Sequence, residues 1–110
     1  MENNELYNDI QSELKQFRFN RNSLGYVYLT DSIALVSKNK SSIKSFKKFI
    51  YPIVAEKYST TSNNVQWCLD KMIALMCFNT SQDIINKYFD YYYYKKPSTK
   101  EFIIEVARKL

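Results

Sequence analysis

The chain has 110 residues, of which 45% are hydrophobic, so we expect one core and a single domain over residues 1–110. Its 16 basic residues outnumber the 11 acidic ones, and the net charge of +5 is compatible with a polyanionic partner. No apolar run approaches the roughly 20 residues that cross a bilayer, and the polar N-terminus differs from a signal peptide. We therefore expect a cytoplasmic protein with no membrane partner.

The residue types used in catalysis and metal binding are scarce. The sequence has no histidine, and its single glycine cannot form a glycine-rich phosphate loop. Cys68 and Cys77 are separated by about 13 Å along one predicted helix, which is too far for a disulfide. We predict two free thiols, and we expect neither an enzyme, nor a cofactor, nor a metal site.

With one glycine and two prolines, the chain offers few of the tight turns that a sheet protein needs. A first helix is predicted from about Glu5 to Phe17. Its apolar residues recur at helical spacing and are Leu6, Ile10, Leu14 and Phe17. Gly25 then offers a turn, and Tyr26 to Tyr28 is compatible with a short strand.

A lysine-rich stretch precedes the next helical pattern. Its side chains either reach phosphates or form a solvated helix face, and they are Lys38, Lys40, Lys44, Lys47 and Lys48. Pro52 falls within the helical spacing that continues to Tyr58. A proline ring clashes with the preceding helical turn, so either the helix kinks there or a new helix begins near Tyr51.

Hydroxyl residues mark the starts of the later helices. Residues 59–62 are Ser-Thr-Thr-Ser, which predicts a turn and an N-cap before a long helix. Residues 79–81 are predicted to end that helix and to cap another, and Ser98 or Thr99 to cap the last. The run Tyr91 to Tyr94 is either a stacking surface for bases or packing at a helix end. The whole pattern predicts an all-α, compact bundle of about six helices.

The segment from Tyr51 to Cys77 has the layout of a helix-turn-helix, with a short helix, a turn and a longer helix. In this motif the N-terminal side chains of the second helix contact base edges in the major groove. Amides that suit adenine are carried by Asn63, Asn64 and Gln66. The residues expected to hold phosphates are Thr60, Thr61 and Lys71.

Three blocks carry a more specific signal, namely residues 24–29 (LGYVYL), 51–61 (YPIVAEKYSTT) and 96–103 (KPSTKEFI). Together they resemble the C-terminal effector domain of stage-zero sporulation protein A, and the resemblance covers nearly the whole chain. It implies a six-helix bundle that binds a short box of double-stranded DNA and contacts the sigma factor of RNA polymerase. We expect a freestanding form that lacks the family's receiver domain. Such a form would not be controlled by phosphorylation within the same chain.

The recognition helix departs from the family's arginine-rich pattern, because the matching positions are Asn64, Trp67 and Asp70. Arginine binds guanine through two hydrogen bonds, whereas aspartate repels phosphate and accepts only from cytosine. Trp67 is either a ring that stacks or wedges against DNA or an anchor in a protein interface. We predict a sequence-specific DNA-binding transcriptional regulator with altered or weakened DNA preference.

The alternative is a protein-interaction module that modulates the full-length sporulation regulator without binding DNA itself. In that interpretation, the loss of arginine converts the recognition face into a protein interface. A homodimer contact would use the same apolar surfaces. Salt-dependent affinity for DNA distinguishes the two functions.

Overall fold

The computed structural model describes residues 2–39, 45–91 and 95–110. Its α-helices in these ranges are α1 (Glu2–Leu14), α2 (Leu24–Lys38), α3 (Tyr51–Lys57), α4 (Ser62–Asn79), α5 (Gln82–Phe89) and α6 (Thr99–Lys109). The described ranges contain no strand, which confirms the predicted all-α bundle. None of the helices described is long and apolar enough to span a membrane. The predicted contacts of Lys40, Lys44 and Tyr92 to Tyr94 concern positions outside the described residues.

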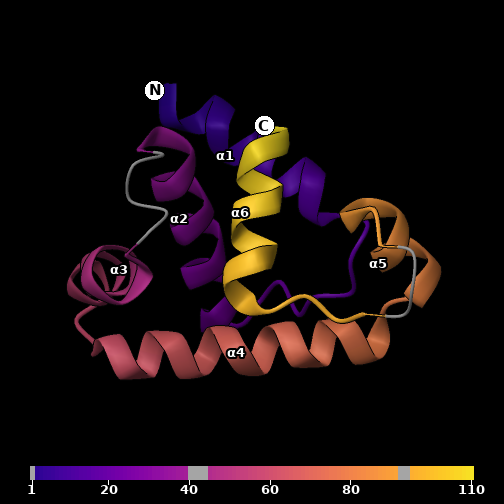
Figure 1. Cartoon of the computed structure of the whole chain (residues 1–110). Helices are drawn as coiled ribbons and strands as arrows, with labels where there is room; N and C mark the ends of the chain where they lie inside the picture. Colours follow the sequence, from indigo (N-terminus) through magenta and orange to yellow (C-terminus); the bar gives the residue numbers. More distant parts are fainter. Residues whose placement is uncertain (1, 40–44, 92–94) are drawn as a thin grey trace.

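α2 lies at the centre of the bundle and packs against α1, α3, α4 and α6 (Figure 1). Ten of its 15 residues are buried, so little of the helix faces solvent. Tyr26 and Tyr28 belong to this helix, and the expected short strand is wrong. A helix buried on nearly every side lacks a clear helical period in its hydrophobic pattern, so a few residues imitate a strand. The N-cap is Ser23, whose hydroxyl accepts from the Tyr26 N–H at 3.2 Å.

Gly25 lies inside α2 and does not form the predicted turn. A Cβ atom at this position would be 3.0 Å from Met72 Cε and 3.4 Å from the Cys68 carbonyl oxygen. The first distance is shorter than an ordinary van der Waals contact. Because Gly25 has no side chain, α2 can approach α4 closely. The need for glycine at this position therefore comes from the packing of the two helices.

Pro52 occupies the first turn of α3, one of the two arrangements that its position in the sequence allowed. A π-helical turn, η2 (Phe46–Ile50), leads directly into α3, and the Tyr51 N–H donates to the Phe46 carbonyl. Because Pro52 has no N–H and its ring would clash in an uninterrupted α-helix, the wider turn ends where the proline begins. The result is a short helix that begins at Tyr51.

α4 lies across one side of the bundle, with α3 beside its N-terminal half and α5 above its C-terminal end in the view of Figure 1. The end of α6 lies on the opposite side of the molecule from α4. α1 ends at Leu14, before the predicted end at Phe17, and the Phe17 N–H donates to the Leu14 carbonyl at 3.1 Å. Phe17 remains buried, with its ring centroid 4.9 Å from that of Tyr88 and 5.1 Å from that of Phe102.

The predicted caps of α5 and α6 are confirmed. The Ser81 hydroxyl accepts from the Asp83 N–H at 3.2 Å. Ser98 and Glu101 form a capping box, in which each side chain accepts from the other residue's N–H, at 3.1 and 2.9 Å. The hydrogen bond from the Ser98 backbone is the largest cause that lowers the pKa of Glu101. These local bonds fix where the two helices begin.

Asp31 joins three parts of the bundle through its buried carboxylate. It accepts hydrogen bonds from the hydroxyls of Tyr7 in α1, at 2.6 Å, and of Tyr58 at the end of α3. Lys57 Nζ lies 3.3 Å from the same carboxylate. We call these four residues the Asp31 cluster, and it holds the end of α3 against α1 and α2 just before the turn to α4.

Candidate nucleic-acid interface

The turn between α3 and α4 closes without a glycine. Ser59 adopts a φ of 55°, the left-handed conformation that glycine more often takes. The Thr60 N–H donates to the Ala55 carbonyl at 2.9 Å, and the Tyr58 N–H to the Val54 carbonyl at 3.2 Å. These bonds close the C-terminal end of α3, so a short turn leads from α3 into α4, the order of elements predicted for a helix-turn-helix. α4 continues to Asn79, two residues beyond the predicted end of the motif.

Two threonines in this turn support the N-terminus of α4. Thr61 is the N-cap, and its hydroxyl oxygen accepts from the Asn64 N–H at 3.1 Å, as the hydroxyl-rich turn predicts. Thr60 Oγ1 accepts from Asn64 Nδ2 at 2.9 Å. Each hydroxyl accepts a bond in this arrangement and keeps its own proton as a donor. The position of both, at a helix N-terminus, suits contact with a phosphate.

The amides predicted to read adenine lie in three different environments. Asn63 is exposed on α4. Asn64 is exposed as well, but its amide donates to Thr60, and its oxygen accepts from Cys68 Sγ at 3.8 Å. Gln66 is half-buried and lines a groove between α4 and its neighbours. A bidentate contact with adenine would require Asn64 to exchange its internal partners, so Asn63 is the more available amide.

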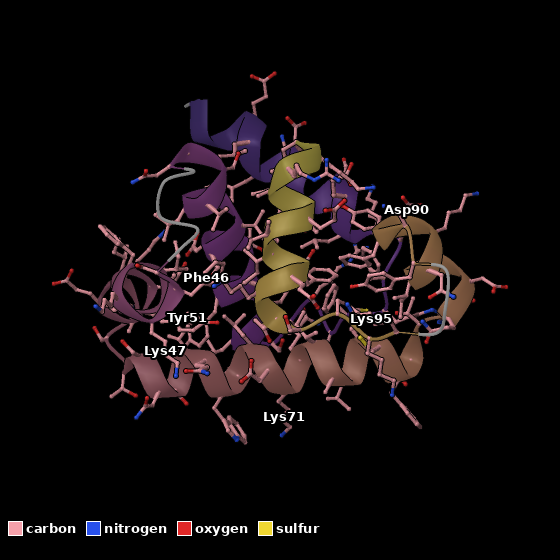
Figure 2. All side chains as sticks on the ribbon, viewed as in Figure 1. Phe46, Lys47, Tyr51, Lys71, Asp90 and Lys95 are labelled. Carbon is pink, nitrogen blue, oxygen red and sulfur yellow. The ribbon has the colours of Figure 1, made fainter. Side chains whose placement is uncertain are left out.

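A lysine-rich groove of about 530 Å³ lies beside the N-terminal half of α4. Lys47 and Lys48 line it from η2, Lys100 from α6, and Gln66 and Asp70 from α4. Figure 2 shows Lys47 beside α4 at the edge of this region. Three ammonium groups against one carboxylate make the groove attractive to phosphate. Lys47 and Lys48 belong to the lysine-rich stretch that was predicted either to reach phosphates or to be solvated. They lie next to α4.

Asp70 is tied to the N-terminus of α6. Its Oδ1 accepts from the Thr99 hydroxyl at 2.6 Å, and Thr99 is buried. Burial and, secondarily, the negative charge of Asp70 raise the pKa of Tyr51 to about 12. The side chain of Asp70 therefore forms a contact that joins α4 to α6.

Trp67 and Lys71 project from the outer side of α4. The Trp67 side chain is 61% exposed, and Lys71 Nζ lies 4.9 Å from the centroid of its ring in a cation–π contact. Figure 2 shows Lys71 pointing away from the bundle. Both residues also line a second, more apolar groove of about 390 Å³, together with Arg18 and Leu24. The outer side of α4 is therefore bordered by both basic and apolar side chains.

Sequence reasoning missed Arg18 and Lys100, which bring positive charge to the two sides of α4. Arg18 follows α1, and Lys100 lies in the first turn of α6, so both are distant in the chain from the helix they flank. Lys100 at least belongs to one of the three blocks that carry the family resemblance. Nothing in the sequence around Arg18 indicates its place beside α4.

The described residues provide little for redox or metal chemistry. Cys68 is half-buried and Cys77 is buried, both as free thiols on α4. Burial raises the pKa of Cys77, which disfavours its reactive thiolate. No group of three or more cysteine, aspartate or glutamate side chains within the described ranges is placed to hold a metal ion.

The comparison with protein families matches residues 10–110 to the model described as Sporulation initiation factor Spo0A C terminal. The chain belongs to this family. The match covers α3, α4, both flanking grooves and the C-terminal helix, and it confirms the resemblance carried by the three blocks. The Spo0A C-terminal family is one of DNA-binding effector domains of a sporulation regulator and not a family of enzymes.

Proposed function

We propose that this chain is a single-domain, sequence-specific regulator of transcription that binds double-stranded DNA through α4, with a preference altered from that of its family. The observation that carries the proposal is the surface around α4, where Lys47, Lys48 and Lys100 line one side and Arg18 and Lys71 the other. A helix between two basic margins matches a major groove bordered by two phosphate backbones. The altered preference follows from Trp67 and Asp70, which stand at arginine positions of the family.

In this function, the predicted site residues would make two kinds of contact, one with base edges and one with phosphates. Base edges would be met by the α4 residues Asn63, Asn64, Gln66, Trp67 and Asp70. Phosphates would be held by Thr60, Thr61 and Lys71, with the lysines of the groove beside them. Asp70 contributes negative charge to this surface, so we expect weaker overall affinity than an arginine at the same place would give.

Fluorescence anisotropy across a salt series tests this proposal. The probes are a labelled duplex that carries the family's DNA box and a labelled pool of random duplexes. We expect binding that weakens steeply as salt increases, because each phosphate contact releases counterions. Selection from the random pool then yields the preferred sequence.

Matched lysine variants show whether the salt dependence arises at α4. Lys47→Ala and Lys100→Ala remove charges from the groove beside α4, and each should lower the salt slope by about one. Lys87→Ala is the control, because Lys87 lines a different cavity with Glu13 and Lys109. Equal effects of all three variants, or no binding to any duplex at low salt, would contradict the proposal.

One observation favours the alternative function, a protein-interaction module. Leu24 and Leu75 line the apolar groove beside Trp67 and are 64% and 53% exposed. Exposed apolar residues around a tryptophan are typical of a protein interface. The candidate partners are the full-length sporulation regulator, the sigma factor of RNA polymerase and a second copy of this chain. A Leu75→Arg variant that loses binding to one of these proteins, but not to DNA, would support this function.

A further inference from the structure

Two polar side chains on the first half of α4 are engaged within the protein, which leaves Asn63 as the exposed amide. Asn64 is bonded to Thr60 and Cys68, and Asp70 to Thr99. In each case the side chain is held toward its own protein. An exposed group in the second turn of α4 therefore gains importance for recognition, because the N-terminal residues of a recognition helix meet the base edges.

Trp67 is the large exposed side chain in that turn. Its indole has one N–H donor and no acceptor, and most of its surface is apolar. Lys71 one turn later lies over the ring, with Nζ 4.9 Å from the centroid. This contact favours one orientation of the indole and places an ammonium group beside it, where a phosphate can be reached.

We propose that Trp67 reads the C5 methyl group of thymine in the major groove, which makes thymine-containing duplexes the preferred substrate class. The inference rests on the proposed DNA-binding function. Of the four bases, thymine alone presents an apolar group in the major groove. An indole placed over cytosine would instead cover an N4 amino donor without offering it an acceptor, which is unfavourable.

The charges around Trp67 favour DNA over an uncharged apolar partner as the ligand of this ring. Lys71 and Arg18 line the same groove as the indole, and both are exposed. A groove lined by this ring and two cations is attractive to a polyanion. Thymine in a duplex combines both requirements, because its methyl group lies between two phosphate backbones.

Duplexes that differ only in the C5 methyl group test the inference. Anisotropy would compare alternating dA·dT with the same duplex containing uracil, which lacks the methyl. It would also compare alternating dG·dC with the same duplex containing 5-methylcytosine, which gains one. We expect the methylated member of each pair to bind about three- to fivefold more tightly per methyl covered, the size expected for burying one such group.

Three variants assign this effect to the indole. Trp67→Ala should bind both members of each pair equally, and Trp67→Phe should retain part of the difference. Ile84→Ala is the matched control, because Ile84 is an exposed apolar residue on α5 that lines a different cavity. Circular dichroism would verify that each variant has the wild-type helix content.

The possible outcomes separate this inference from the proposed function. Salt-dependent binding with no difference within either pair would overturn the role of Trp67 and leave DNA binding intact. A methyl preference that persists in Trp67→Ala would also overturn it, because another residue would then be the reader. Failure to bind any duplex at low salt would contradict the proposed function as well.

Discussion

The Asp31 cluster and the outer side of α4 show opposite ways of treating polar groups. In the cluster, a buried carboxylate is satisfied by Tyr7, Tyr58 and Lys57, which come from different parts of the fold. On the outer side of α4, Trp67 and Lys71 are exposed and contact each other. The first region ties the end of α3 to α1 and α2, whereas the second leaves its side chains exposed at the surface. Stability and binding should therefore be separable by mutation.

The largest effect is expected for Asp31→Ala. The substitution removes the acceptor of two tyrosine hydroxyls and the partner of Lys57. Bonds to a charged acceptor are strong, so we expect the free energy of unfolding to fall by about 2 to 4 kcal/mol. Urea denaturation followed by circular dichroism measures it. Asp9→Ala, which removes an exposed carboxylate from α1, is the control, and an equal loss in that variant would contradict a special role for the cluster.

Alkaline pH should weaken the same cluster. Burial, and then the hydrogen bond to Asp31, raise the pKa of Tyr7 to about 12, and the pKa of Tyr58 is raised by the same causes. Tyrosine in the unfolded chain titrates near pH 10, about two units lower than folded Tyr7. The unfolded chain thus loses its proton first, so stability is complete below pH 10 and decreases toward pH 12.

Urea midpoints measured at a series of pH values test this expectation. Asp31→Asn is the comparison, because a neutral amide no longer raises the tyrosine pKa by its charge. The wild type should lose more stability than Asp31→Asn between pH 10 and pH 12. Parallel decreases in the two proteins would show that other tyrosines dominate the alkaline transition.

A smaller effect is expected where α4 meets α6. Thr99→Val removes the hydroxyl that donates to Asp70 at 2.6 Å, but it preserves the shape of the side chain. Because the carboxylate is exposed to water, we expect a loss of about 1 kcal/mol in the free energy of unfolding. A double-mutant cycle with Asp70→Ala measures the coupling, and strictly additive losses would mean that this hydrogen bond does not stabilise the fold.

The smallest effect on stability is expected on the outer side of α4. Trp67→Ala and Lys71→Ala remove side chains that are exposed in the folded protein. The free energy of unfolding should change by less than about 0.5 kcal/mol in each, and urea denaturation checks this. A loss as large as that of Asp31→Ala would abolish the distinction between the two regions.

The number and type of the elements could be predicted from the sequence, because they depend on contacts between residues close in the chain. Amphipathic spacing and hydroxyl caps are local, so Thr61, Ser81 and Ser98 mark the starts of their helices in the structure as they do in the sequence. The family could be predicted for the same reason, since the blocks that carry the resemblance are continuous in the chain.

Two errors arose where a neighbouring helix decides the outcome. Gly25 was expected to form a turn, but its lack of a side chain serves the close approach of α4 at Met72. Tyr26 to Tyr28 was compatible with a strand, but burial of α2 on nearly every side determines its hydrophobic pattern. Neither neighbour is visible within a short window of sequence.

By itself, the sequence determined the all-α class, the helix caps and the family. Only the tertiary structure decided which polar groups on α4 remain available, because the partners of Asp70 and Asp31 lie more than 20 positions away in the chain. It also decided that Arg18 and Lys100 flank α4. Hydrogen bonds and electrostatic fields act through space, and separation along the chain does not reveal them until the helices have packed.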